Sequence, residues 1–453
     1  MKNLIFCLLI TLTISGCRKL SEVGSPKNQL TTDKVFADTG SANAALGNIY
    51  AQLNKTIQNN LIINMDLYAD NLIYTGSTTQ ILEFYRSKLS TDNTSNLTLW
   101  QNLYLTVYEC NDLIEQVSGS TKLSVPTVQQ MTGEALFLRA YSYFLLVNLY
   151  GKVPLITNTN VNANAQASQV DESVVNQQIL SDLTAAANRL TADYPGGGRV
   201  RANTWAAQAL LAKIYLFQKN WPLAESSATA VINSNLYSLS SCANTFLANS
   251  NETILQFWNQ NGFVSSAVSL APSSNTSLPQ YPVTNSLLNS FENGDLRKVN
   301  WLGYNTIPIG TNTVTYAYYY KYKNRMQNSS APEYSSALRI AELYLIRAEA
   351  RANQNKLFGS TGAEADVNII RNRAGLMNTK AIDKTSILSV IKQERRVELF
   401  GEWASRFFDL KRYENIDVVI GGQKNTWIST ASALPIPLNE LTYDSHLIQN
   451  SGY

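Results

Sequence analysis

The chain has a single histidine, His446, among its 453 residues. A metal site with two histidine ligands is therefore excluded, and a Ser-His-Asp or Cys-His catalytic arrangement is disfavoured. Charge is scarce as well, because only 15% of the residues are charged and 36 Lys and Arg face 33 Asp and Glu. A net charge of +3 over this length gives no basic patch of the kind that binds nucleic acid.

Cysteine and long hydrophobic runs are also rare. Of the four cysteines, Cys7 and Cys17 lie near the N-terminus, which leaves Cys110 and Cys242 for the body of the chain. One disulfide bond between these two is possible, but Cys110 lies in an apolar helical run and is predicted to be a buried free thiol. No segment after Cys17 is apolar over the roughly 20 residues that a membrane-spanning helix needs.

The N-terminal residues have the pattern of a bacterial export signal. Lys2 is followed by an apolar run from Leu4 to Ile14, which has the length of a signal-peptide core. The residues Ile14-Ser15-Gly16-Cys17 match the lipobox, in which the cysteine is acylated and becomes the first residue of the mature chain. We predict a signal peptide over residues 1–16 and a lipidated Cys17 with a tether over residues 17–38, which would hold the protein on a membrane. An ordinary secretory signal with a coincidental cysteine is the alternative.

Apolar residues recur at helical spacing through much of the chain. Residues 131–150 are apolar almost all round, which is typical of a buried central helix, and Gly151 and Pro154 follow as stop signals. Further helices are predicted over residues 41–53, 97–117, 204–219, 223–233, 341–353 and 363–374.

Four of these predicted helices form two pairs that resemble tetratricopeptide repeats. Asn203 can cap the helix over 204–219, and a turn at Trp221 leads into the next helix. Small residues such as Ala212 and Ala224 would let the two helices approach closely, and Tyr215 would fill the space beside them. Residues 341–353 and 363–374 form a similar pair with a longer connection.

The character of the sequence changes between residues 239 and 332. Pro, Gly, Asn and Ser interrupt this stretch, and helical periodicity is lost. Residues 311–323 are rich in Tyr and Thr, which favours a strand. We expect a long irregular region that lies over a helical scaffold, where functional surfaces are commonly built.

The chain also contains five blocks of longer, more specific sequence. They are GEALFLRAYSYF at 133–144 with YGKVPL at 150–155, GRV at 198–200 with AAQALLAKIYL at 206–216, LR at 338–339 with ELYLIRAEA at 342–350 and RNRAGL at 371–376, ERRVEL at 394–399 with RFFDLKRY at 406–413, and PIP at 435–437 with QNSGY at 449–453. In this order, and together with the lipobox, they resemble the SusD/RagB family of outer-membrane nutrient-binding lipoproteins.

The resemblance implies a mainly α fold. It implies a scaffold of four tetratricopeptide-like helical pairs with a long irregular loop region that contains a little β structure. The expected parts are an N-terminal helical region over residues 39–238, a variable ligand-side region over 239–332, and a C-terminal helical region with an extended tail over 333–453.

The resemblance also implies a function. A lipid-anchored protein of the outer membrane, facing the cell exterior, would capture a glycan or oligosaccharide and pass it to a SusC-like TonB-dependent transporter. No catalysis, cofactor or metal is expected. One alternative is a transporter lid or scaffold that binds a peptide or has no ligand of its own, and a surface glycosidase is another.

Several charged residues lie among apolar ones at helical spacing, namely Glu134, Arg139, Glu394, Arg395, Arg396 and Glu398. They could be read as catalytic acids and bases. Because a charge in a protein core must be partnered, we predict instead that they form buried ion pairs that fix helix packing.

The ligand site is predicted from aromatic residues in loops, because an aromatic ring can cover the apolar face of a sugar while amides and charged groups bind its hydroxyls. Trp301 and Tyr304 beside Gly303, and Tyr74 beside Gly76, are favoured because neighbouring glycines suggest exposed turns. The full predicted set is Tyr74, Arg86, Asn93, Trp258, Trp301, Tyr304, Tyr318 and Tyr320. For any single aromatic, the alternative is that its ring fills the core beneath its loop.

Overall fold

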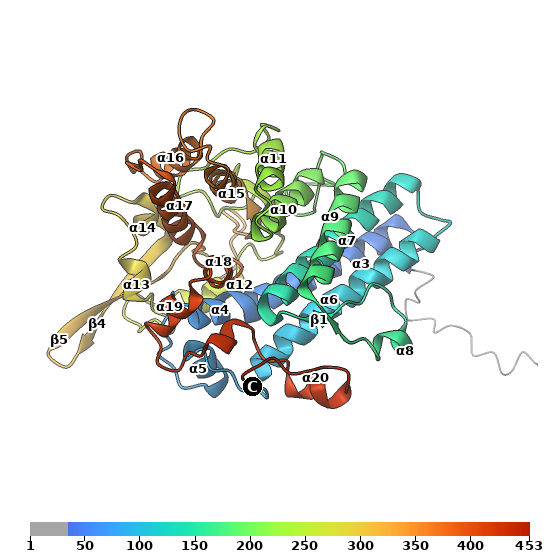
Figure 1. Ribbon diagram of the computed structural model, residues 1–453, viewed down its shortest axis with the longest axis horizontal. Coiled ribbons are helices and arrows are strands. Elements are labelled where there is room, and N and C mark those ends of the chain that lie inside the picture. The colour runs from blue at the N-terminus through green and yellow to red at the C-terminus, as the bar shows by residue number, and fades with distance from the viewer. Residues whose placement is uncertain (1–34) are drawn as a thin grey trace, which may run out of the picture.

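The computed structural model of the chain describes residues 35–453, and helices make up most of it (Figure 1). The predicted signal peptide and Cys17 lie outside the described residues. The long helices are α3 (Thr39–Thr56), α6 (Thr94–Gly119), α7 (Val125–Tyr150), α9 (Glu172–Arg189), α10 (Thr204–Phe217), α11 (Trp221–Ile232), α15 (Ile340–Asn353), α16 (Ala363–Arg373) and α17 (Lys384–Leu399). The mainly α fold class with little β structure is therefore confirmed.

Shorter helices fill the connections between the long ones. They are α4 (Ile62–Tyr68), α5 (Thr79–Tyr85), α8 (Val161–Asn164), α12 (Ser265–Leu270), α13 (Asn285–Leu288), α14 (Leu296–Trp301), α18 (Ser405–Arg412), α19 (Ile416–Gly421) and α20 (Leu438–Tyr443), with a π-helical turn η2 (Ile57–Leu61) between α3 and α4 and a 3₁₀ turn η3 (Ser429–Ser432).

The long helices pack as a continuous series. α3 contacts α6, α6 contacts α7, and contacts continue through α9, α10, α11 and α15 to α16 and α17. In Figure 1 this series runs from α3, α6, α7 and α9 on the right to α15, α16 and α17 at the upper left. Each predicted helix is present within a few residues of its expected bounds, and the two predicted pairs are α10 with α11 and α15 with α16.

Helix α7 lies inside the series, as its apolar sequence predicts. Every residue from Met131 to Val147 is buried, whatever its side of the helix. The helix begins six residues before the predicted start, because the Ser124 side chain caps its first turn and Pro126 lies within that turn. It ends at Gly151, whose positive φ of 74° suits glycine.

The strands form three two-stranded sheets among the described residues. They are β1 (Val153–Pro154) with β2 (Gln169–Val170), β3 (Thr253–Phe257) with β6 (Ser335–Arg339), and β4 (Leu302–Ile309) with β5 (Asn312–Tyr319). β5 confirms the strand predicted in this segment, and β4 pairs with it in register from Leu302 with Tyr319 to Ile309 with Asn312. This hairpin projects from the body at the lower left of Figure 1.

The C-terminal tail crosses the ends of α6 and α7. Backbone Leu434 N–H donates to the carbonyl of Leu149 at 2.8 Å, and the Asn450 side chain donates to the carbonyls of Tyr150 and Leu434, each at 2.8 Å. The Asn96 side chain of α6 donates to the carbonyl of Pro435 at 2.9 Å. These bonds fix the tail and bring α20 beside α6, although the two are far apart in the sequence (Figure 1).

Cys110 and Cys242 are both free and buried. This confirms the buried thiol predicted at Cys110. Burial raises the pKa of the Cys242 thiol to about 11, so the thiol is protonated at neutral pH. Within residues 35–453, no helix combines the length and the apolar character that crossing a membrane would require.

Candidate functional site

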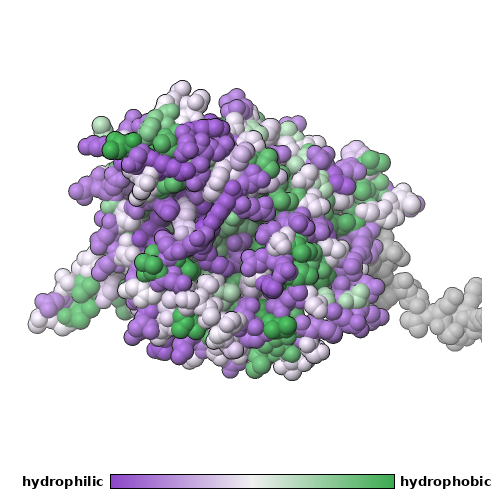
Figure 2. Space-filling view, viewed as in Figure 1, coloured by the Kyte–Doolittle hydropathy of each residue, from purple (hydrophilic) through white to green (hydrophobic). Residues whose placement is uncertain are grey.

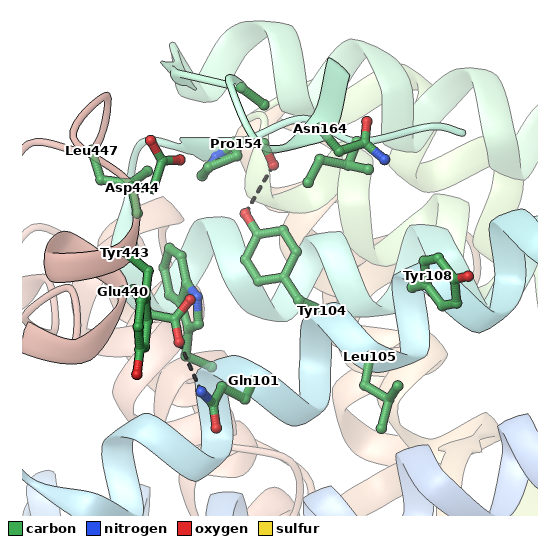
Figure 3. A pocket seen from close by; sticks show the side chains of 13 residues that line it. Gln101, Tyr104, Leu105, Tyr108, Pro154, Asn164, Glu440, Tyr443, Asp444 and Leu447 are labelled. Atoms are coloured by element: carbon green, nitrogen blue, oxygen red, sulfur yellow. Dashed lines mark hydrogen bonds between the residues drawn. The ribbon is translucent and has the colours of Figure 1, made fainter. Parts of the chain in front are cut away.

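A cavity with aromatic walls lies between α6 and α20 (Figure 3). Its volume is about 390 Å³, within the range of pockets that hold small organic ligands. We call it the α6–α20 groove. Its floor is formed by Trp100, Gln101, Tyr104, Leu105 and Tyr108 of α6, one wall by Glu440, Tyr443, Asp444 and Leu447 of the tail, and the other by Pro154, Ile156, Asn164 and Ala167.

The aromatic side chains of the groove differ in exposure. Tyr443 is 85% exposed and Tyr108 is 46% exposed, so both can present a ring face to a ligand. Tyr104 is held in place because its hydroxyl donates to the carbonyl of Pro154 at 2.8 Å and its ring packs 4.9 Å from Trp100. The groove therefore has a fixed aromatic floor with freer tyrosines at its edges.

Polar groups surround these rings. The Gln101 amide donates to Glu440 Oε1 at 2.8 Å, which joins the floor to the tail (Figure 3). Asp444 accepts from the backbone N–H of His446 at 2.9 Å. Asn164 lines the opposite wall, and its amide donates to the carbonyl of Asn158 at 2.9 Å. Rings that cover apolar faces, set among carboxylates and amides that bind hydroxyls, suit a polyhydroxylated ligand.

Sequence reasoning missed every residue of this groove. The signal on α6 was present, because Leu105 and Tyr108 lie outside the apolar stripe of Trp100, Leu103, Tyr104 and Val107 that packs inward. Large apolar residues on the outer face of a helix are the informative ones. Nothing in the sequence indicates that α20 would lie opposite them.

The predicted exposure of Tyr74 and Trp301 is wrong, and Asn93 of the predicted ligand set is buried as well. Tyr74 is 6% exposed, and its ring stacks on Tyr281 with centroids 5.6 Å apart. Trp301 is 1% exposed and its indole N–H donates to the carbonyl of Cys242 at 2.7 Å. Asn93 is 3% exposed and caps α6 by accepting from the backbone N–H of Asn96 at 3.0 Å. In this structure none of the three presents a free surface.

The glycines beside these residues have another explanation than an exposed turn. A Cβ on Gly76 would lie 2.4 Å from the Tyr74 hydroxyl, and one on Gly303 would lie 2.3 Å from the ring of Tyr318. Each glycine therefore leaves room for an aromatic ring to lie across the backbone. Gly303 lies within strand β4 opposite Tyr318, not in a turn.

The other predicted aromatics are at least partly accessible but lie outside the groove. Trp258 is 59% exposed just after β3, and Tyr304 is 44% exposed on β4. Tyr318 and Tyr320 are half-buried and pack edge to face with centroids 5.9 Å apart. The β4–β5 hairpin has no charged residue and is mostly green and white in Figure 2. A ligand role for these four residues stays a prediction.

Arg86 is exposed at the edge of a second cavity, of about 280 Å³. Lys424 also lines this cavity, but its ammonium group donates to the carbonyl of Tyr68 at 3.1 Å and to Ser87 Oγ at 2.9 Å. Burial lowers the pKa of Lys424 to about 7, against the effect of the Asp70 carboxylate. Asp70 in turn is bound by Arg396 and Arg406. Arg86 is therefore the freer cation of the two, and its ligand role stays a prediction.

The charged residues of the sequence blocks form buried ion pairs, as predicted. Glu134 binds Arg201 at 2.6 Å, and Arg139 binds Asp182 at 2.6 Å. Around Glu398, the guanidinium groups of Arg339, Arg373 and Arg297 all lie within ion-pair distance. Burial raises the pKa of Glu398, but these three cations outweigh it and hold the pKa well below its usual range. These carboxylates form structural ion pairs in the core. They do not form the exposed pair of acids that a catalytic site would need.

Two family models match the sequence and together cover most of it. Residues 22–216 match a model described as starch-binding associating with outer membrane, and residues 253–453 match the model of the SusD family. The chain belongs to the SusD family. The resemblance drawn from the sequence blocks is thereby confirmed.

Relatives in the SusD family match over the full length of the chain. A SusD-like protein of Formosa agariphila is 23% identical, and the match covers 100% of this chain and 99% of the relative. A second SusD-like protein of the same organism is 24% identical, with 98% of each chain covered.

Solved structures of SusD-like proteins have the same fold. A SusD superfamily protein from Bacteroides vulgatus superposes with a TM-score of 0.79 at 20% identity, covering 92% of this chain and 100% of that one. A protein described as a laminarin-binding SusD-like protein has a TM-score of 0.77 at 23% identity, covering 91% and 99%. The surface glycan-binding protein A from Bacteroides fluxus has a TM-score of 0.75 at 22% identity, covering 91% and 99%.

Proposed function

We propose that the chain captures a glycan in the α6–α20 groove. The observation that carries the proposal is the set of aromatic rings at the surface of this groove, with carboxylates and amides around them. The exposed rings of Tyr108 and Tyr443 would stack on the apolar faces of sugar residues. Glu440, Asp444 and Asn164 would bind the hydroxyl rims.

The arrangement of the carboxylates favours binding over hydrolysis. A glycosidase places two carboxyl groups on opposite sides of the bond that it cleaves. Glu440 and Asp444 come from one wall of the groove, four residues apart, and Glu440 is engaged by Gln101. We therefore propose a binding protein without catalytic activity.

Capture would serve transport at the cell surface. The lipobox supports lipidation at Cys17 and attachment to a membrane. The proposed location in the outer membrane, with the body facing the exterior, is what membership of the SusD family favours. We propose that a SusC-like TonB-dependent transporter takes over the bound glycan. Modest affinity with fast release suits such a handover better than very tight binding.

Binding is tested with the full-length protein in detergent. A glycan panel is screened first, and each hit is titrated by calorimetry together with Tyr108→Ala and Tyr443→Ala. Loss of one stacked ring is worth about 0.5–1.5 kcal/mol, so each variant should bind up to about tenfold more weakly. Tyr304→Ala is the matched control, since it removes an equally exposed tyrosine from the hairpin.

Four results would count against the proposal. If Tyr108→Ala and wild type bind the glycan with equal affinity, the groove is not the binding site. If only Tyr304→Ala binds the glycan more weakly, the site lies at the hairpin. Release of reducing sugar from a bound hit would overturn the assignment as a binding protein. Absence of any glycan hit would favour the lid or scaffold alternative.

The anchor and the partner have their own test. Cys17→Ala should abolish incorporation of a labelled fatty acid and move the protein out of the outer-membrane fraction. Wild-type protein extracted from its native membrane should co-purify with a TonB-dependent transporter. Continued membrane attachment of Cys17→Ala would contradict the lipid anchor.

A further inference from the structure

The segments that form the α6–α20 groove carry acidic residues but no basic ones. They are α6, the segment over residues 153–170, and the tail over residues 425–453. These segments contain no Lys or Arg, although the chain as a whole has slightly more basic than acidic residues. The acids Glu109, Asp112 and Glu115 lie on α6, and Glu440 and Asp444 lie on the tail.

The two carboxylates that line the groove have neutral hydrogen-bond donors as partners. Glu440 accepts from the Gln101 amide at 2.8 Å. Asp444 accepts from the backbone N–H of His446. Its Oδ1 also lies 2.9 Å from Nδ1 of the His446 ring, which is exposed. In the part of the chain that the structure describes, neither makes an ion pair with Lys or Arg. Within residues 35–453, the negative charge of Glu440 and Asp444 is therefore not balanced by Lys or Arg in direct contact.

The acids on α6 behave in the same way. Glu115 accepts from the backbone N–H of Thr159 at 3.0 Å, Glu109 accepts from Asn48 at 3.0 Å, and Asp112 accepts from Gln116 at 3.2 Å. This contrasts with the core, where Asp182, Glu134 and Glu398 are each bound by arginine. Exposed acids elsewhere, such as Asp38 and Asp383, also accept from neutral donors, so the groove is distinguished by the lack of Lys and Arg among its lining residues rather than by the partners of its acids.

We infer that the α6–α20 groove selects uncharged glycans and excludes glycans that bear uronate or sulfate groups. The inference rests on the proposed function and names the class of its ligand. A carboxylate or sulfate brought among Glu440 and Asp444 would meet like charge in a partly desolvated site. A neutral sugar hydroxyl would instead donate to the same carboxylates in a charge-assisted hydrogen bond.

The test compares forms of one glycan that differ in charge. A neutral hit from the panel is oxidised at its primary hydroxyls to the uronate, and part of that product is converted to the methyl ester. The ester has the altered group without the charge, so it controls for the change in shape. All three are titrated into full-length wild-type protein at low and at high salt.

We expect the uronate to bind at least tenfold more weakly than the ester at low ionic strength. The gap should narrow at 0.5 M salt, because screening weakens the repulsion. In the double variant Glu440→Gln with Asp444→Asn, the ratio between ester and uronate should fall toward one, even if both bind more weakly than to wild type.

Equal or tighter binding of the uronate would overturn the inference while leaving the proposed function in place. A ratio between ester and uronate that the double variant does not change would do the same. If an acidic glycan of the panel is a hit and Tyr108→Ala weakens it, the inference fails in the same way. If neither neutral nor acidic glycans bind, the proposed function fails and this inference fails with it.

Discussion

At the scale of single residues, Arg297 joins three carboxylates in the core. Its side chain is fully buried and binds Asp295 at 2.8 Å, Glu394 at 2.8 Å and Glu398 at 3.1 Å. Arg297→Met would leave these acids without one of their cations inside the protein. We expect a loss of about 3–5 kcal/mol in the free energy of unfolding, measured by denaturant titration.

The matched control is the exposed pair of Lys219 with Glu414, at 2.5 Å. Lys219→Gln should leave the free energy of unfolding nearly unchanged, because solvent screens the pair. Arg297→Lys keeps the positive charge but loses the several N–H donors of the guanidinium group. Its loss of unfolding free energy should therefore lie between those of Arg297→Met and Lys219→Gln. A cost for Arg297→Met no larger than that of the control would contradict a structural role for the network.

Asp66 should make stability depend on pH in a direction opposite to the paired acids. It is buried without a cation in ion-pair contact, and burial raises its pKa to about 6, although bonds from Tyr319 at 2.7 Å and Gly401 N–H at 3.0 Å oppose the shift. The folded state therefore binds the Asp66 proton more tightly than the unfolded state. The stability that this proton contributes is fully present below about pH 4 and is lost as the pH rises through 6.

The measurement is the difference in unfolding free energy between wild type and Asp66→Asn across pH 4 to 7. The shift from 3.8 to about 6 corresponds to about 3 kcal/mol, so wild type should lose about that much relative to the variant over this range. The asparagine can be accommodated because Asn71 Oδ1 lacks a partner and can accept from it after a flip of the Asn71 amide. A difference that does not change with pH would show that the pKa of Asp66 is not raised.

A glycine in the sequence can mark either an exposed turn or a place where a side chain lies close against the backbone. Gly76 and Gly303 were expected to mark exposed turns, but each accommodates an aromatic ring from a nearby residue. The partner of Gly303 is set by the register of β4 and β5. The sequence predicts β5 but not β4, and the register between two strands cannot be predicted when only one of them is recognised.

At the scale of elements, helices were predicted well because their signals are local. Asn203 illustrates this, since the residue expected to cap α10 does so, accepting from the backbone N–H of Ala206 at 2.9 Å. Its amide also donates to the carbonyl of Ala192 at 2.9 Å, and the side chain is fully buried. Short elements such as α20 and β4 were missed, because they lack periodicity and depend on tertiary contacts.

Asn203→Ala should therefore destabilise the protein by about 2 kcal/mol, since it removes a buried cap together with the hydrogen bond that its amide donates to the Ala192 carbonyl. Asn220 offers a matched control, because it caps α11 in the same way but from a more exposed position and with a longer bond of 3.4 Å. Asn220→Ala should cost less than about 1 kcal/mol. Equal losses in thermal or chemical unfolding would mean that burial of the Asn203 cap adds nothing.

At the scale of the whole molecule, the scaffold and the candidate site differ in how they are encoded. The family and the helical series follow from sequence blocks that are contiguous along the chain. The α6–α20 groove is formed by residues that are distant in sequence, such as Gln101 and Glu440, which are separated by 339 positions. The position of the tail depends on backbone hydrogen bonds to Leu149 and Tyr150 that leave no pattern in the sequence.

At this scale, the exposed aromatic residues of the chain lie in more than one place. The irregular region over residues 239–332 contributes buried rings such as Trp301 to the core and exposed rings to the hairpin. The groove instead lies at the opposite end of the series, beside α6 and the tail. Division of the chain into three functional parts therefore stays a prediction, and the ligand side need not coincide with the irregular region.

The most direct test of the account is the position of bound sugar in a crystal of the full-length protein soaked with the tightest neutral glycan. The account predicts sugar rings in the α6–α20 groove, stacked on Tyr108 or Tyr443 and with hydroxyls bonded to Glu440 or Asp444. Sugar bound at the β4–β5 hairpin or beside Arg86, with the groove holding none, would contradict it.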